Sequence, residues 1–182
     1  MEKTDPGELA SRTQVRSQAF AAKSCAIALG SNLGESGQVI AAALQRLETL
    51  EETVVTARSS LYQTAPVGPP QPDYLNACAL VETRLSPQGL MAQLLAIEAD
   101  FGRIRQERWG PRILDLDLIL YADQVVNEPD LQLPHPRFRE RAFVLVPLAE
   151  IAPHWVDPVT GQTLLNLCNA LDRAGVKPLA PR

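Results

Sequence analysis

Residues 113–121 carry the most constraining pattern in this sequence, because aspartate and large apolar side chains alternate through the segment. A period of two predicts a β-strand, in which successive side chains point to opposite faces of a sheet. One predicted face carries both Asp115 and Asp117, followed by Ile119 and Tyr121. The other face comprises Leu114, Leu116, Leu118 and Leu120. The fold must therefore bury the leucines while it keeps two carboxylates together.

The apolar residues before this strand predict five further elements in a recognisable order. Continuous or alternating apolar runs predict strands at 25–29, 54–62 and 75–81. Apolar residues at helical spacing predict helices at 40–50 and 86–101, and later ones at 140–151 and 162–171. Strand, helix, strand, strand, helix, strand is the ferredoxin-like βαββαβ order. We therefore predict an α+β fold with this core, extra strands and C-terminal helices.

Length and composition bound the rest of the prediction. A chain of 182 residues with 46% hydrophobic residues builds one core, so we expect a single domain at 25–182. Residues 1–24 are polar without a sustained apolar face and are expected to be a disordered extension. No run approaches the roughly 20 apolar residues of a membrane span, and the scattered cysteines suggest no disulfide or zinc site. A net charge of −4 argues against a nucleic-acid partner. We also expect the protein to be cytoplasmic, with reduced cysteines, and to be a monomer.

The carboxylates of Asp115 and Asp117 are expected roughly 6–7 Å apart at Cβ, which suits one or two magnesium ions. The alternative is an ordinary solvated sheet face neutralised by nearby arginines. Arg108 and Arg112 lie on the segment that enters the strand, and paired acids with arginines are typical of a clamp for polyphosphate and metal. The chain has no Walker loop and only three lysines, so arginine and metal would have to hold the phosphates.

Two other groups of residues are candidates for ligand contacts. His135 stands between two prolines and precedes Arg137, Arg139 and Arg141, a setting that suits a nucleotide phosphate. The alternative is a structural histidine beside a solvated arginine row, which is the expectation for two of the three arginines. Tyr74 and Asn76 share a strand face and combine a ring with an amide, which suits a flat heterocycle. Taken alone, such a pair is more commonly explained by packing of a strand end against the proline-rich loop.

The chain resembles the hydroxymethyldihydropterin pyrophosphokinase family across residues 26–156. Six segments carry the resemblance, in this order: 28–34 (ALGSNLG), 62–66 (YQTAP), 71–76 (QPDYLN), 107–112 (ERWGPR), 114–118 (LDLDL) and 134–136 (PHP). The resemblance implies transfer of pyrophosphate from ATP to the hydroxymethyl group of 6-hydroxymethyl-7,8-dihydropterin, with release of AMP, in folate biosynthesis. No covalent nucleophile is needed, because positioning and charge neutralisation carry such a transfer.

The resemblance also implies roles for individual residues. Asp115 and Asp117 would bind two Mg²⁺ ions, and the catalytic residues would be Arg103, Arg112 and Asp117. Contacts to ATP would come from Glu98, Arg103, Arg105, Trp109, Arg112, Leu118, His135 and Arg141. The pterin would lie among Thr64, Pro66, Val67, Tyr74, Asn76, Trp109 and Phe143.

Two other functions compete with this interpretation. A nucleotidyltransferase also combines Gly-Ser with Asp-x-Asp, but those elements lie close together in that class, whereas Ser31 and Asp115 are separated here by three elements. A non-catalytic ferredoxin-like module that binds RNA would present aromatic side chains along its central strands. Asn76 and Glu82 do not supply them.

Overall fold

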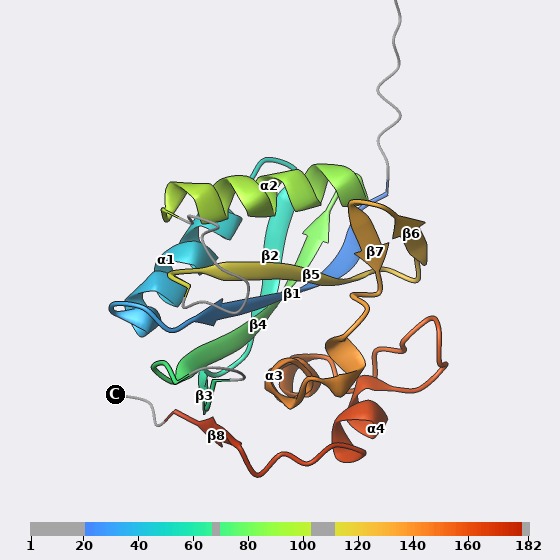
Figure 1. Ribbon diagram of the computed structural model, residues 1–182. Helices are drawn as coiled ribbons and strands as arrows, with labels where there is room; N and C mark the ends of the chain where they lie inside the picture. Colours follow the sequence, from blue (N-terminus) through green and yellow to red (C-terminus); the bar gives the residue numbers. More distant parts are fainter. Residues whose placement is uncertain (1–20, 67–69, 103–111, 180–182) are drawn as a thin grey trace, which may run out of the picture.

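A six-stranded antiparallel sheet forms the centre of the computed structural model, which describes residues 21–66, 70–102 and 112–179 (Figure 1). Strand β1 (Lys23–Ser31) lies between β4 (Tyr74–Thr83) and β5 (Asp115–Tyr121). On its other side β4 pairs with both β2 (Thr53–Arg58) and β3 (Tyr62–Thr64), and β3 pairs with β8 (Val176–Pro178). The predicted N-terminal extension falls mostly in residues 1–20, outside the described residues.

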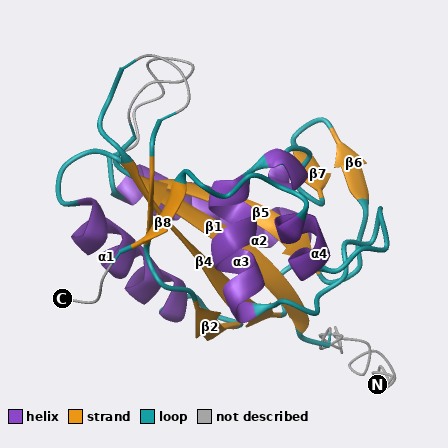
Figure 2. Cartoon of the chain, turned by 90° about the horizontal axis from the view of Figure 1, so that it is seen from below, coloured by secondary structure: helices purple, strands orange, loops and turns teal. Residues whose placement is uncertain are grey.

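Helices cover the two faces of this sheet in pairs, as Figures 1 and 2 show. One core packs α1 (Ser36–Glu48) and α2 (Pro87–Asp100) against the sheet. A second core, on the other face, contains α3 (Ala142–Ile151) and α4 (Leu164–Asn169). The order β5, β1, β4, β2 with α1 and α2 on one face confirms the predicted ferredoxin-like βαββαβ core. None of the described helices is both long and apolar enough to cross a membrane.

The segment predicted as one strand at 54–62 is instead two short strands, β2 and β3. The Ser59 backbone N–H still donates to the Cys78 carbonyl at 2.9 Å, but the Ser60 backbone N–H bonds to a side chain and not to β4. The Ser59 hydroxyl accepts a hydrogen bond from the Cys78 backbone N–H at 2.9 Å. The Ser60 backbone N–H and hydroxyl both donate to the carboxylate of Glu150 on α3. Side-chain bonds of this kind compete with strand pairing, and they are not visible in an apolar pattern.

The prediction of extra strands did not locate them. The structure places them at β6 (Val126–Glu128), β7 (Leu131–Leu133) and β8. A 3₁₀ helix η1 (Phe138–Glu140) follows β7. The polar alternation of three-residue strands is too short to separate from a loop, which is why the sequence pattern missed them.

Strand β5 contains a β-bulge that corrects the predicted alternation. Ala26 of β1 pairs with Leu120, but the next residue, Ile27, pairs with Leu118, so Ile119 is an extra residue on β5. Leu120 consequently packs in the α3 core beside Ile119 rather than with the other leucines, and Tyr121 packs in the α1 and α2 core. The predicted faces are therefore correct as far as Ile119 and wrong for Leu120 and Tyr121, because a bulge advances the strand by one residue.

An ion pair fixes the polypeptide between η1 and α4. Arg139 donates two hydrogen bonds of 2.7 Å to the carboxylate of Asp157, whose side chain is 0% exposed. Burial alone would raise the pKa of Asp157, but hydrogen bonds from Arg139, Thr160 and Val159 outweigh it and lower the pKa to about 2. Arg139 is therefore a structural arginine and does not belong to the solvated row that the sequence suggested.

The depressed pKa of Asp157 predicts a specific acid sensitivity. A carboxyl group with a lower pKa in the folded state stabilises the fold above its unfolded pKa near 3.8, and this contribution disappears as the pH falls towards 2. The shift corresponds to about 2 kcal/mol. We expect the difference in free energy of unfolding between wild type and Asp157→Asn to shrink by this amount between pH 5 and pH 2 in urea titrations. A difference that stays constant over this range would contradict the assignment.

Candidate active site

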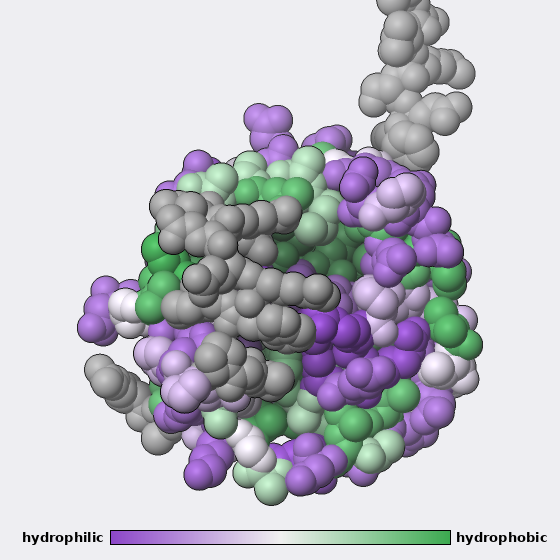
Figure 3. Space-filling view, viewed as in Figure 1, coloured by the Kyte–Doolittle hydropathy of each residue, from purple (hydrophilic) through white to green (hydrophobic). Residues whose placement is uncertain are grey.

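A cavity of about 360 Å³ opens between the β5 side of the sheet and α3. It is lined by Ala28, Leu29, Gly30, Thr64, Ala65, Tyr74, Asn76, Arg112, Asp115, Asp117, His135, Arg137, Arg141, Phe143 and Val144. In the space-filling view a strongly hydrophilic patch lies over the region between β5 and α3 (Figure 3). The lining thus joins a charged end on β5 and η1 to a less polar end on β3, β4 and α3.

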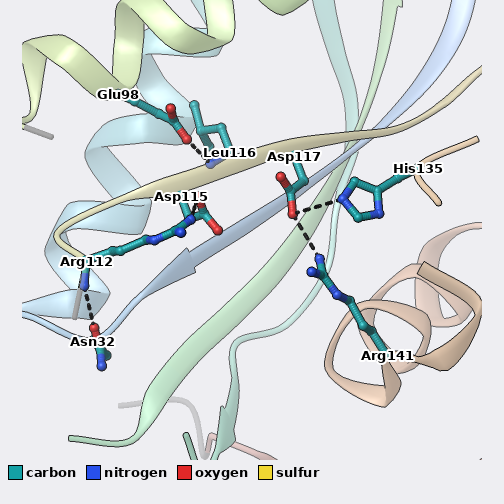
Figure 4. A network of polar contacts seen from close by, with 8 residues as sticks. All are labelled: Asn32, Glu98, Arg112, Asp115, Leu116, Asp117, His135 and Arg141. Carbon is teal, nitrogen blue, oxygen red and sulfur yellow. Dashed lines mark hydrogen bonds and ion pairs between the residues drawn. The ribbon is translucent and has the colours of Figure 1, made fainter. Parts of the chain in front are cut away.

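The charged end is built around the two strand carboxylates, each of which faces an arginine (Figure 4). Arg112 Nη1 lies 2.5 Å from Asp115 Oδ1, and Arg141 Nη1 lies 3.1 Å from Asp117 Oδ2. The aspartate side chains are 27% and 30% exposed. Both carboxylates lie on the predicted common face and remain open to the cavity, where an anionic ligand with its cations would compete for the arginines.

His135, on the segment after β7, approaches the carboxylate of Asp117. Its backbone N–H donates to the carbonyl of the bulge residue Ile119 at 2.9 Å, and its Nε2 lies 3.8 Å from Asp117 Oδ2. Burial lowers the pKa of His135, and the positive charges of Arg141 and Arg137 lower it further, against the opposite effect of Asp117. Nδ1 accepts a hydrogen bond from the Arg137 backbone N–H at 3.2 Å, so the neutral ring carries its proton on Nε2, towards Asp117.

The buried side chain of Asn32 positions the start of the carboxylate strand. Its Oδ1 accepts a hydrogen bond from the Arg112 backbone N–H at 2.8 Å, and its own backbone N–H donates to the Arg112 carbonyl. Its Nδ2 donates to Gln71 Oε1 and to the Pro72 carbonyl. The glycine turn at 30–34 therefore ties the proline-rich loop to Arg112. No local sequence pattern indicates this role of Asn32, because its partners lie 39, 40 and 80 residues away along the chain.

Glu98 and Leu118 contribute to the scaffold rather than to the cavity wall. The Glu98 carboxylate on α2 is 1% exposed and accepts a hydrogen bond of 2.7 Å from the Leu116 backbone N–H, which fixes the outer edge of β5 (Figure 4). Leu118 is buried in the α1 and α2 core, on the face opposite the carboxylates. The predicted nucleotide contacts of these two side chains are therefore not supported, because neither lines the cavity.

The less polar end presents a buried amide and two aromatic rings. Asn76 on β4 donates from Nδ2 to the Thr64 hydroxyl at 2.8 Å, which fixes the orientation of its amide. It pairs across the sheet with Gly30, so no side chain from β1 covers the amide Oδ1. Tyr74 and Phe143 line the same end, and Arg141 Cζ lies 5.5 Å from the Phe143 ring centroid. Arg141 therefore touches both ends of the site.

The structure brings together most of the predicted site residues that it describes. Nine of them line the cavity: Thr64, Tyr74, Asn76, Arg112, Asp115, Asp117, His135, Arg141 and Phe143. Pro66 is half-buried next to the lining residue Ala65 but does not line the cavity. Arg103, Arg105, Trp109 and Val67 lie outside the described residues. Arg137, which was predicted only as a member of the arginine row after His135, lines the cavity too.

The donor set of the charged end fits magnesium. Hard cations of this type take carboxylate oxygens, and Mg²⁺ is commonly held by one or two carboxylates together with water and substrate phosphates. Asp115 and Asp117 supply such oxygens from one strand face. Within residues 21–66, 70–102 and 112–179 no group of three or more His, Cys, Asp or Glu could enclose a metal by itself. The remaining ligands would thus have to come from a phosphate-bearing substrate and water.

Comparison with known proteins identifies the family. The model of the 7,8-dihydro-6-hydroxymethylpterin-pyrophosphokinase (HPPK) family matches residues 26–153. The chain belongs to the HPPK family. Two of its relatives are named 2-amino-4-hydroxy-6-hydroxymethyldihydropteridine pyrophosphokinase. The Synechocystis protein is 48% identical over 155 residues, which cover 85% of this chain and 80% of that protein. The Pseudomonas aeruginosa protein is 45% identical over 154 residues, which cover 84% and 94%.

Solved HPPK-DHPS structures support the fold of this HPPK-family chain. Wild-type Plasmodium falciparum HPPK-DHPS, solved with pterin and p-hydroxybenzoate, superposes with a TM-score of 0.66 at 14% sequence identity. Another HPPK-DHPS, solved in complex with substrates, also gives a TM-score of 0.66, at 11% identity. The matches cover 84% and 83% of this chain but only 44% and 43% of the solved chains. At these low sequence identities the matches support only the shared ferredoxin-like fold.

Proposed function

We propose that this chain transfers pyrophosphate from ATP to 6-hydroxymethyl-7,8-dihydropterin and releases AMP, as a step of folate biosynthesis. The observation that carries the proposal is the single cavity with two unlike ends. Asp115 and Asp117 stand at one end with their arginines, and Asn76 lines the other end together with Tyr74 and Phe143. The first arrangement suits a metal-bound polyphosphate and the second suits a flat polar heterocycle.

At the nucleotide end, Asp115 and Asp117 would hold two Mg²⁺ ions, which supply the charge neutralisation that phosphoryl transfer needs. Arg112 and Arg141 would exchange their carboxylate partners for phosphate oxygens, because guanidinium groups bind both in the same fork-like geometry. The Nε2 proton of His135 would donate to a phosphate oxygen. Arg103 and Arg105 remain predicted contacts of this end.

At the pterin end, the oriented amide of Asn76 would read the polar edge of the ring, and Tyr74 and Phe143 would pack against its faces. Thr64, Pro66, Val67 and Trp109 remain predicted to shape this pocket. The hydroxymethyl oxygen would then point towards Asp117. A lone pair of that oxygen would form the new bond to the β-phosphorus while the bond from the β-phosphorus to the α,β-bridging oxygen breaks, and this oxygen would leave as part of AMP. Asp117 would orient the hydroxyl and accept its proton, which then passes to solvent.

The broader setting of the reaction is also part of the proposal. One chain supplies both ends of the cavity, which supports a monomeric enzyme with a single domain from about residue 25. The cysteines Cys25, Cys78 and Cys168 are buried free thiols, as expected of a reducing compartment, and ATP is available in the cytoplasm. We therefore place the reaction there.

The decisive experiment identifies the nucleotide product in the presence and absence of the pterin. We expect AMP to form from ATP only when 6-hydroxymethyl-7,8-dihydropterin is present, with one diphosphorylated pterin per AMP. Formation of ADP would indicate an ordinary kinase. Release of inorganic pyrophosphate with a nucleotidylated product would indicate the nucleotidyltransferase instead, and either result would refute the proposal.

Asn76→Ala is expected to raise KM for the pterin at least tenfold while KM for ATP changes less than twofold. The substitution removes an oriented donor and acceptor from a buried site, which costs about 1–3 kcal/mol of ligand binding. Steady-state kinetics with each substrate varied in turn would measure both constants. Thr64→Val is the matched control, because it removes the partner hydroxyl and keeps the amide, so a smaller rise is expected. Equal rises for ATP and pterin would argue against Asn76 as the pterin reader.

A further inference from the structure

Arg139 and Asp157 form a charged pair that the proposed chemistry does not use. Two parallel hydrogen bonds of 2.7 Å join Arg139 Nε and Nη2 to the two oxygens of Asp157. The Arg139 guanidinium also lies 4.7 Å from the ring centroid of Phe138, which is fully buried in the α3 core. A bidentate, partly desolvated pair of this kind fixes direction as well as distance.

The partner Asp157 sits in a turn that is itself held firmly. Besides Arg139, its carboxylate accepts hydrogen bonds from the Thr160 hydroxyl at 2.6 Å and the Val159 backbone N–H at 3.2 Å. Its backbone N–H donates to the Gln162 carbonyl, and its carbonyl accepts from the Gly161 N–H, both at 2.9 Å. Every acceptor position of Asp157 is therefore engaged, and the turn is a fixed platform for Arg139.

The segment attached to this platform is the one that surrounds Asp117. It begins at His135, continues through η1 and ends at Arg141, which caps α3. His135 Nε2 and Arg141 Nη1 lie 3.8 Å and 3.1 Å from the same atom, Asp117 Oδ2. Arg139 lies on η1, two residues before Arg141. Its side chain binds the 157–162 turn and does not line the cavity.

The Arg139–Asp157 pair also gives one of three closely spaced arginines a different role from the other two. Arg137, Arg139 and Arg141 alternate along the segment, and the first and last line the cavity. Asp157 neutralises Arg139, so this guanidinium does not compete for Asp117 or for an anion. Without Asp157 the freed cation would lie two residues from Arg141 and would disturb the pairing at Asp117.

We propose that Asp157 and Arg139 are positioning residues for the nucleotide: they hold segment 135–141 so that His135 and Arg141 meet the phosphates at Asp117. The pair would thus affect the affinity for ATP much more than the affinity for the pterin, since Thr64, Tyr74 and Asn76 lie on β3 and β4, outside this segment. This inference rests on the proposed function, because that function assigns the charged end to ATP.

The test compares Arg139→Gln, Asp157→Asn and the double variant with wild type. The measurements are the dissociation constant of a non-hydrolysable ATP analogue with Mg²⁺, by calorimetry without pterin, and the KM values of both substrates. We expect each single change to weaken analogue binding about five- to tenfold, with the pterin KM within twofold. Because two members of one contact act as a unit, the double variant should bind about as well as the weaker single variant.

Matched controls separate positioning from general loss of stability. Arg46 and Asp100 form an exposed ion pair far from the cavity, so Arg46→Gln and Asp100→Asn should leave every constant unchanged. Arg139→Lys keeps the charge and can make one bond to Asp157, so it should fall between wild type and Arg139→Gln. It also serves as the measurable variant if the others fail to fold.

Analogue binding within twofold of wild type in Arg139→Lys and both neutral variants would overturn the positioning role, as would equal rises in both KM values. Wild type that binds the analogue without forming AMP would refute the proposed reaction, yet the same calorimetry would still decide the role of the pair. Wild type that does not bind the analogue would overturn both.

Discussion

Asp117→Asn is expected to lower kcat/KM for AMP formation by at least about a thousandfold. The change keeps the size of the side chain but removes the charge that would hold metal at the centre of the site. Arg141 at 3.1 Å and His135 at 3.8 Å face the same oxygen, so they lose a common partner as well. Because the side chain is 30% exposed and lies at a cavity, the fold should survive.

The measurement is initial-rate AMP formation at saturating Mg²⁺, with thermal melting of each variant in parallel. Asp123→Asn is the matched control, since Asp123 is an exposed carboxylate in the turn directly after β5 and does not line the cavity. That control should retain wild-type kinetics. Turnover of Asp117→Asn near the wild-type rate would remove the metal assignment and leave Asp117 as a simple partner of Arg141.

Arg112→Ala is expected to cost about a hundredfold in kcat/KM, with most of the loss in kcat. Only the side chain is removed, so the two backbone hydrogen bonds between Arg112 and Asn32 remain and the start of β5 stays in place. The loss would instead reflect a phosphate that is no longer neutralised. Asp115, 2.5 Å away, would also lose its guanidinium partner.

Arg112→Lys tests whether charge alone is enough. Lysine keeps the positive charge but lacks the planar fork, so an intermediate loss of activity is expected. Arg46→Ala is the control for removal of an arginine–aspartate pair, because its partner Asp100 lies on α2 outside the cavity. If Arg112→Ala lowered the melting temperature in proportion to activity, its role would be structural.

The core of the fold was predictable because its elements are long and patterned. The apolar patterns located β1, α1, β4 and α2. The helix predicted at 86–101 is present, and Ser86 caps it with its hydroxyl, which accepts from the Gly89 N–H at 3.0 Å. The three-residue strands carry too few residues for a period to emerge. The break after β2 depends on Glu150, a residue some 90 positions away that local propensity does not register.

The site residues that could be predicted are those marked by a short pattern in the sequence. Asp115 and Asp117 share a face by strand geometry, and His135 is marked by its flanking prolines. The pairing of Arg139 with Asp157 and the bonds of Asn32 are tertiary contacts between segments without any periodic pattern. Sequence reasoning therefore found the charged groups but could not say which arginines face the ligand and which serve the scaffold.

The extra residue at Ile119 divides β5 into two parts with opposite phase. Up to Leu118 the even-numbered positions face α1 and α2, whereas after the bulge Tyr121 takes over that direction. A saturation scan of polar substitutions should therefore show tolerance that alternates as far as Asp117, followed by four consecutive intolerant positions from Leu118 to Tyr121, all of which are buried. Lineages that lengthen or shorten the strand beyond Ile119 would change its packing without turning the aspartates away from the cavity.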